Sequence, residues 1–282
     1  MVAPAGGQLT EAMHETLSLG SAAIQALFPV TSGDEMRGHG DSNEIASLAD
    51  DDFAGIWDAL MTRLEAIPEY VEMFENAYPE ESFDDMTFAH AANAIAAFEI
   101  AGFEARQSPW QRFVAGDDKA LSRSQLWGAK VFFDSGCASC HNGAMLTDFE
   151  HHNTGMAQFG PGKGDGESGR DDFGRFRETD DPADLYAFRT PTLHNVALTA
   201  PYGHVGQHAN LLQHVVHYAS PVWSLALYSI EYLVEDEVLY DQFEENRRAV
   251  IDAGLDPDMP DLRAWNSFAI VSFLHSLTDP AS

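Results

Sequence analysis

The 282-residue sequence predicts a mainly α-helical protein. Along several stretches the apolar residues recur at steps of three and four, which is the period of a helix with one buried face. Alternation of apolar and polar residues, the signal for a half-buried strand, is weak throughout. Hydrophobic residues make up 45% of the chain and aromatic residues 11%, so apolar side chains suffice for one large or two ordinary domains.

Three helices are predicted in the first part of the chain, after a mixed region with one short apolar run at 22–30. The first covers 51–67, where two aspartates suit the start and apolar residues follow the helical period. The second, 68–78, opens with a proline, which is favoured in the first turn of a helix. The third covers roughly 84–105 and places its apolar residues on one side.

The second part of the chain alternates helices with long loops. A turn and short helix are expected at 108–118, and a longer helix begins near Ser122 and runs into the stretch SGCASCHNG at 135–143. Further helices are predicted at about 209–219, 235–253 and 261–277.

Two of the connecting segments are unusual. Residues 147–185 contain seven glycines and many aspartates, yet aromatic residues persist through them, so we expect an ordered loop. The run FRTPTLHNVALTAPYGH at 188–204 has a proline at each end of its apolar part, which is consistent with a segment that wraps a buried ligand.

The chain is strongly acidic, with 45 acidic and 15 basic residues and a formal net charge of −30. Nucleic acid is therefore an unsuitable partner, because phosphate binding needs clustered Lys and Arg. With only three lysines, we interpret the composition as adaptation to a saline environment, the alternative being an ordinary acidic protein. The sequence contains no apolar run of about 18 residues, so no membrane span is expected. Its N-terminus lacks the pattern of a signal peptide.

The motif CASCH contains the only two cysteines, Cys137 and Cys140, directly followed by His141. A C-x-x-C pair can form a redox dithiol, half of a zinc site or the covalent anchor of a haem. A redox dithiol usually follows a strand, whereas a helix precedes this pair, and zinc would need two further ligands, for which His151 and His152 are candidates. A haem explains every residue of the motif, because two thiols bond its vinyl groups and the adjacent imidazole binds its iron.

A haem that carries electrons as a low-spin centre needs a second axial ligand. Sequence distance alone does not choose among the candidates, which are Met145, Met156, Met259, His204, His208, His214, His217 and Tyr218.

Beyond the motif, longer stretches resemble a known family. GCASCHNG and the run AFRTPTLHNVALTAPYGHVGQHANLLQHVVHY at 187–218 are similar to the C-terminal haem domain of bacterial dihaem cytochrome c peroxidases, which include the MauG-type enzymes. QALFPVTSGDEM at 25–36 resembles the segment over the peroxidatic haem of that family. The resemblance implies cytochrome c-like helical domains with long ordered loops: 1–106 as a truncated remnant of the N-terminal peroxidatic domain, and 107–282 as a complete C-terminal electron-transfer domain.

The family carries two c-type haems, of which the N-terminal one reacts with hydrogen peroxide and the C-terminal one relays electrons. The resemblance implies that Cys137 and Cys140 bind the C-terminal haem, with His141 as its proximal ligand. The distal ligand of the family falls fourteen residues after His204, on Tyr218. That position holds Met in peroxidases with a high-potential relay haem and Tyr in MauG-type members.

The resemblance also assigns roles outside the haem motif. Gln25 corresponds to a glutamine that orients peroxide, and Glu35 to an acid that moves a proton between the peroxide oxygens. A calcium ion lies between the haems of the family, held partly by backbone carbonyls at the positions of Thr199 and Pro201.

The sequence departs from the family in one large respect, because it contains no second C-x-x-C-H motif. The family's arginine in the PTLRN motif is also replaced, by His194. The chain is then either a truncated reading frame or a natural one-haem derivative. We expect truncation, because Gln25 and Glu35 make sense only over a second iron.

The function that the resemblance implies is two-electron reduction of hydrogen peroxide, with electrons from a small donor such as a cytochrome c or a cupredoxin. A MauG-like member would instead oxidise a protein substrate, which Tyr218 favours. The alternative from another class is a monohaem electron carrier without peroxidase activity, and a haemless scaffold that uses the dithiol is a third. Haem attachment implies an extracytoplasmic, periplasmic location, and homodimers occur in the family.

Overall fold

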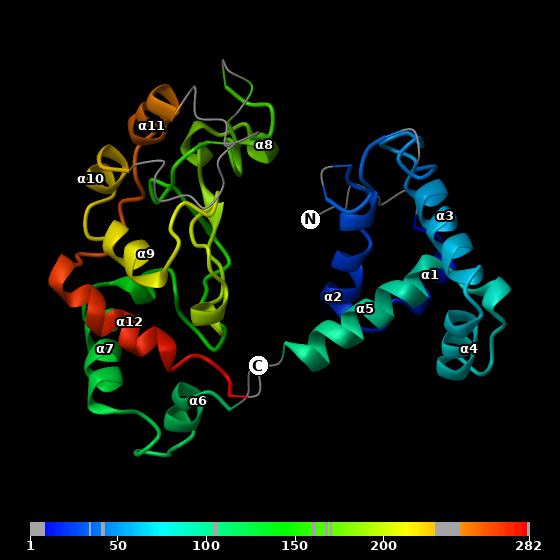
Figure 1. The fold of residues 1–282 in the computed structure, drawn as a ribbon, viewed down its shortest axis with the longest axis horizontal. Coiled ribbons are helices and arrows are strands. Elements are labelled where there is room, and N and C mark those ends of the chain that lie inside the picture. Colours follow the sequence, from blue (N-terminus) through cyan, green and yellow to red (C-terminus); the bar gives the residue numbers. More distant parts are fainter. Residues whose placement is uncertain are drawn as a thin grey trace. The chain divides into compact units, whose positions relative to one another are not determined.

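The computed structural model describes residues 9–33, 35–40, 43–103, 107–159, 162–166, 169, 171–228 and 243–280 (Figure 1). The chain divides into two compact units, residues 1–104 and 105–282, whereas the boundary expected from the sequence lies between 106 and 107. Helices dominate both units, and the named strands among the described residues form one short antiparallel pair. The prediction of a mainly α fold is confirmed. None of the described helices is both long and apolar enough to cross a membrane.

The first unit is a small helical bundle around an apolar core. In it α2 packs along α5, and both α1 and α3 also contact α5. The ring of Trp57 is buried in the core, and its Nε1–H donates to the carbonyl of Leu27 at 3.0 Å. The helices are α1 (Glu11–Thr16), α2 (Gly20–Ala26), α3 (Phe53–Glu65), α4 (Pro68–Ala77) and α5 (Phe88–Gly102), with 3₁₀ turns η1 (Pro29–Thr31) and η2 (Phe83–Asp85).

Local signals in the sequence explain where these helices begin. The carboxylate of Asp52 accepts from the backbone N–H of Gly55 and caps α3, and Pro68 occupies the first turn of α4. Helix α5 begins at Phe88, later than predicted, after Thr87, whose backbone N–H donates to Nδ1 of His90 at 3.1 Å. The short helices α1 and α2 were absent from the predicted elements.

In the second unit α7 and α12 form the centre of the packing, with α9 against α12. The two helices approach so closely at Gly128 that an added Cβ would overlap the carbonyl oxygen of Ala269. The named elements of this unit are α6 (Pro109–Val114), α7 (Arg123–Asp134), η3 (Cys137–Ser139), β1 (His151–His152), α8 (Phe176–Thr179), η4 (Pro182–Asp184), β2 (Phe188–Arg189), η5 (Val196–Leu198), α9 (Leu211–His217), α10 (Pro221–Ala226), α11 (Phe243–Asp252), η7 (Ala264–Asn266) and α12 (Ser267–His275). The strands β1 and β2 pair antiparallel, with His151 opposite Arg189.

Most of the helices predicted for this unit are present, and α8 and α10 were missed. The helix predicted at 235–253 is described only from Phe243, because 229–242 lie outside the described residues. The glycine-rich segment 147–185 is held by side chains where it is described. Asp165 accepts from the backbone of Phe173 at 2.8 Å, and the Tyr186 hydroxyl donates to Asp171 at 3.0 Å.

Candidate functional site

The cysteine motif lies directly after α7. Gly136 ends the helix with a φ of 86°, a left-handed conformation in which glycine avoids a Cβ clash. Cys137 then opens η3, and the N–H of His141 donates to the Cys137 carbonyl at 3.0 Å. This turn places both sulfurs and the imidazole on the wall of one cavity.

Both cysteines are free and partly buried. Burial raises the pKa of the Cys137 thiol to about 12, and it also raises the pKa of Cys140. A redox dithiol needs a thiol whose pKa is lowered, because the thiolate is the nucleophile. The environment of this pair therefore disfavours the redox interpretation.

The imidazole of His141 is held in one tautomer. Its Nδ1 lies 3.1 Å from the carbonyl oxygen of Leu146, which can only accept, so Nδ1 carries the proton and Nε2 carries a lone pair. Burial lowers the pKa of His141, although the carbonyl of Leu146 works in the opposite direction. A neutral imidazole with a fixed Nδ1–H and an open Nε2 is the form that binds a metal ion.

The cavity beside the motif has a volume of about 400 Å³ and mainly apolar walls. Its apolar side chains come from α7, η5, α9, α12 and the loop before η5, and they are Phe132, Leu193, Val196, Leu211, Val215, Ile270 and Leu274. An apolar cleft with two thiols and a metal-binding imidazole at its wall suits a flat hydrophobic macrocycle. The residues present fit a covalently attached haem.

Two further ligand-type side chains line the cavity, His214 on α9 and Tyr218 directly after it. Burial raises the pKa of Tyr218 to about 12, against the effect of a hydrogen bond from the Thr154 side chain. Burial also lowers the pKa of His214 to about 3, as do the charges of His208, His217 and His141. The structure therefore brings Tyr218, which the sequence analysis expects as the distal ligand, to the cavity that contains His141.

The other sequence candidates are placed differently. His204 lines the cavity, but its Nε2 lies 3.1 Å from a carboxylate oxygen of Asp172 and its ring stacks on Phe188. Thr199 and Pro201 also line the cavity, on the loop that leads to His204. Among the methionines, Met156 and Met259 line the cavity, whereas Met145 is half-exposed.

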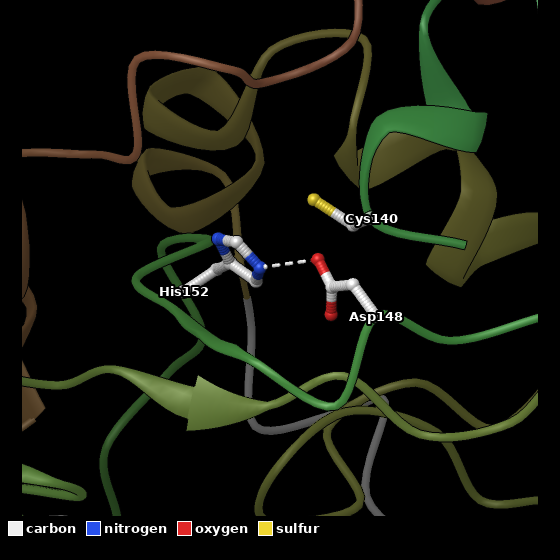
Figure 2. A group of neighbouring side chains, drawn as sticks. All are labelled: Cys140, Asp148 and His152. Carbon is white, nitrogen blue, oxygen red and sulfur yellow. Dashed lines mark hydrogen bonds and ion pairs between the residues drawn. The ribbon is translucent and has the colours of Figure 1, made fainter. Parts of the chain in front are cut away.

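A charged cluster next to Cys140 escaped the sequence analysis. His152 donates from Nδ1 to Asp256 at 2.7 Å and from Nε2 to Asp148 at 3.0 Å (Figure 2 shows the Asp148 bond). Burial alone would lower the pKa of His152, but the two carboxylates outweigh it and raise that pKa, so the ring is stabilised as a cation. Asp148 lies four residues before His152, but Asp256 comes from a distant loop that no sequence pattern connects to it.

This cluster bears on the zinc interpretation. One donor atom each of Cys140, Asp148 and His152 lies within 4.8 Å of the others. Both ring nitrogens of His152 are engaged with carboxylates, so a metal would have to displace one of these bonds. The second candidate, His151, bonds the Arg175 guanidinium through Nδ1 at 2.9 Å instead.

The two residues expected to handle peroxide lie in the first unit. Gln25 is on α2 and Glu35 follows η1, and both side chains are exposed. The cavity described above is lined by residues of the second unit alone. His194, which replaces the family's arginine, donates from Nε2 to the carbonyl of Ala144 at 2.9 Å.

Comparison with known proteins agrees with the site. A family model described as di-haem cytochrome c peroxidase matches residues 8–119. Cytochrome c551 peroxidase of Pseudomonas aeruginosa is 43% identical over 144 residues, and the methylamine utilization protein MauG of Methylorubrum extorquens is 30% identical over 202 residues. These matches support a place for the chain among the dihaem cytochrome c peroxidases and MauG proteins.

A member of this family with known structure covers most of the chain. The crystal structure of a MauG-like protein associated with microbial copper homeostasis aligns with 93% of the chain and 70% of its own length, with a TM-score of 0.62 and 27% identity. The curated relatives are longer than the present chain. The two matches above cover 51% and 70% of this chain, but only 40% of the peroxidase and 48% of MauG.

Proposed function

We propose that this chain is a c-type haem protein that acts in the reduction of hydrogen peroxide to water, with a haem held by Cys137, Cys140 and His141. The observation that carries the proposal is the environment of His141. Its Nδ1–H is fixed on the Leu146 carbonyl, its Nε2 is left for a metal, and two protonated thiols lie beside it in an apolar cavity. Peroxidases and MauG proteins are the relatives of the chain.

The residues of the cavity have separate tasks in this proposal. Cys137 and Cys140 fix the macrocycle through thioether bonds, and His141 supplies the proximal nitrogen. A bound haem supplies an iron that cycles between the ferric and ferrous states and so carries one electron at a time. The apolar side chains of α9 and α12 exclude water from both faces of the cleft, which tunes the reduction potential.

Gln25 and Glu35 would handle peroxide in the first unit. Reduction of one peroxide to two waters consumes two electrons and two protons. In this proposal Glu35 moves a proton from one peroxide oxygen to the other, and Gln25 orients the substrate by hydrogen bonding. The exposure of both side chains leaves them accessible to a small substrate.

A small basic electron donor, such as a cytochrome c or a cupredoxin, suits the acidic chain. A net charge of −30 attracts a cationic partner over a distance that salt shortens, to a Debye length of roughly 10 Å at 0.1 M. We therefore expect the rate of electron delivery to fall as ionic strength rises. The proposal includes a periplasmic location, a calcium ion at the carbonyls of Thr199 and Pro201, and a homodimer as further family traits to be tested.

A monohaem electron carrier is the second candidate function. It is favoured by the lining of the cavity, which comes from the second unit alone and includes neither Gln25 nor Glu35. It is also favoured by the further ligand-type groups that line the cavity beside His141, because a second ligand would leave no open position on the iron. The MauG relatives support a third variant, oxidation of a protein substrate.

Haem counting and a turnover assay separate these functions. The full chain would be produced with haem-attachment machinery, its haem measured as the pyridine haemochrome, and its peroxide turnover assayed with small donor proteins. The peroxidase proposal expects turnover that Glu35→Gln abolishes at unchanged haem content. One haem per chain without turnover would leave the electron carrier, and protein without a Soret band would reject every haem function.

A further inference from the structure

The imidazole of His141 depends on the backbone of a short loop for its orientation. Its Nδ1–H donates to the carbonyl of Leu146, five residues further along the chain. Leu146 has a φ of 51°, in the left-handed region where the Cβ of an L-residue crowds the backbone. A residue persists in such a conformation only when its surroundings hold it there. The contacts that hold this loop therefore decide where the carbonyl of Leu146 points.

The two carbonyls before that of Leu146 are held by side chains of one distant segment. The carbonyl of Ala144 accepts from Nε2 of His194 at 2.9 Å. The carbonyl of Met145 accepts from the hydroxyl of Thr192 at 2.6 Å. The same hydroxyl accepts from the backbone N–H of His194 at 3.3 Å, which ties the two donors together. Three successive carbonyls of the loop thus each receive a side-chain donor.

The loop is fixed on the other side of Leu146 as well. Thr147 is buried, its backbone N–H donates to the carbonyl of Asn142 at 2.9 Å, and its hydroxyl donates to the carbonyl of Thr190 at 2.7 Å. The side chain of Leu146 is itself buried in the core around α7 and α12. Residues 190–194 therefore hold the loop both before and after the carbonyl that receives the proton of His141.

The ring of His194 is held in one tautomer at a cost to stability. Because the carbonyl of Ala144 can only accept, Nε2 carries the proton and Nδ1 carries a lone pair. That Nδ1 is buried and has no hydrogen-bond partner in the described part of the chain. A buried acceptor without a partner is destabilising, and an apolar side chain at this position would avoid it. Filling of the loop alone therefore does not explain His194, whereas the bond to Ala144 does.

We propose that His194 and Thr192 are positioning residues for His141, and that they act through the carbonyl of Leu146. By fixing the two preceding carbonyls, they aim that of Leu146 at Nδ1–H. A firm hydrogen bond at Nδ1 makes Nε2 a stronger electron donor, which stabilises a ferric iron relative to a ferrous one. The inference deepens the proposed function and rests on it, since it requires a haem iron at His141.

The experiment compares the full chain, matured with haem, with His194→Leu and His194→Gln. Leucine provides no donor, whereas the amide of glutamine retains an N–H for the carbonyl of Ala144. His275→Leu is the matched control, because His275 is exposed at the end of α12 and is not part of the cavity lining. The pyridine haemochrome assay measures haem content, and a spectroscopic redox titration gives the midpoint potential. Nuclear magnetic resonance of ¹⁵N-histidine-labelled protein measures how fast Nδ1–H of His141 exchanges with solvent.

We expect His194→Leu to keep its haem and to have a higher midpoint potential. At a fixed solution potential, the ratio of ferrous to ferric haem should rise about three- to tenfold, the factor that corresponds to one weakened hydrogen bond. Exchange of Nδ1–H of His141 should become faster by a similar factor. His194→Gln should restore both values, and His275→Leu should change neither. Thr192→Val removes the neighbouring donor and should shift both values in the same direction as His194→Leu.

Other outcomes overturn the inference. If His194→Leu lowers stability but leaves the midpoint potential and the Nδ1–H exchange of His141 unchanged, His194 has only a packing role. If His194→Leu fails to fold, Thr192→Val decides in its place, because valine has nearly the shape of threonine and lacks only the donor. An unmodified chain that contains no haem contradicts the proposed function instead, and the Nδ1–H exchange in the haem-free chain and its variants then tests the positioning by itself.

Discussion

The two units use their buried polar groups in different ways. In the first unit such groups bind one another across helices, as when the Asn93 amide donates to the Thr16 carbonyl at 2.8 Å and accepts from the Ser18 N–H at 3.2 Å. In the second unit, His141 and His214 line a cavity, and the protein holds Nδ1 of each ring. Imidazoles on the wall of an apolar cavity, rather than helix content or core size, distinguish the unit that contains the site.

The concave surfaces of the two units also differ. A recess of about 370 Å³ in the first unit, at the end of α3 and beside α4 and η2, is lined by Glu65, Glu75 and Asp84 among others. The cavity of the second unit is mainly apolar. A charged recess stays hydrated because burial of carboxylates is costly, whereas an apolar cavity favours a hydrophobic ligand.

The largest expected effect on the difference between the two units comes from removing the two thiols of the second unit. Replacement of Cys137 and Cys140 by Ser should abolish covalent haem entirely, because no thioether bond remains. Haem staining of denaturing gels and the haemochrome assay measure this loss. Gln25→Ala in the first unit should leave haem content unchanged, and covalent haem that persists in the double serine variant would refute the assigned attachment site.

Substitution of one glycine in each unit tests whether two helices pack closely at Gly128 in the second unit. Gly128→Ala would force a Cβ into the Ala269 carbonyl and to 2.9 Å from the Cβ of Phe273, so α7 and α12 must separate. We expect a loss of about 3 kcal/mol of unfolding free energy, at the upper end for overpacking.

Gly102→Ala is the matched control in the first unit. A Cβ there meets only the Phe98 ring, at 3.9 Å, and alanine favours the last turn of α5, so the effect should be neutral or stabilising by up to about 1 kcal/mol. Urea denaturation of the full chain measures both variants. Equal effects of the two substitutions would contradict the close approach of α7 and α12.

The helices that the sequence predicted correctly are those with strong local signals. Asp52, Pro68 and Ser122 each satisfy or remove N–H groups at a helix start, and the apolar period follows directly after them. The missed helices α1, α2, α8 and α10 have four to seven residues, too few for a clear apolar period.

Parts of the site lay beyond local patterns. The motif CASCH identifies Cys137, Cys140 and His141 because their spacing carries the chemistry. The partners of His152 come from two loops, and Asp256 lies 104 residues away along the chain. Hydrogen bonds also separate His214 from His217, although both are histidines of one helix; spacing alone cannot show which ring nitrogen is open.

The two neighbouring histidines of β1 should affect the pH dependence of the unfolding free energy in opposite directions. The pKa of His152 is raised above its ordinary 6.5, so its bonds to Asp148 and Asp256 stabilise the fold fully below that value and weaken as pH rises through the folded pKa. His152→Asn should therefore cost about 1.5–3 kcal/mol at mildly acidic pH and less at alkaline pH.

For His151 the change of stability with pH has the opposite sign. Burial, followed by the charges of Arg175 and Arg189, lowers its pKa, so the native chain loses stability as pH falls below the ordinary value and the unfolded imidazole takes up a proton. His151→Asn should remove this loss. Urea midpoints of both variants across pH check the signs, and parallel curves would show that the carboxylates do not hold His152 as a cation.

The smallest expected difference concerns helix caps, which both units share. Asp52→Ala and Ser122→Ala each remove the acceptor for an N–H in the first turn, of Gly55 at 3.0 Å and of Gln125 at 3.3 Å. Each should lower the unfolding free energy by about 1 kcal/mol, and Asp52→Asn and Ser122→Thr should restore most of it. Hydrogen exchange of the amides in α3 and α7 measures both losses. Ser122 caps the end of α7 that is remote from Cys137, so haem content should stay constant in Ser122→Ala. A drop in haem content would mean that a change at the start of this helix reaches the attachment turn. The site would then depend on the whole of α7 and not only on the residues that face the cavity.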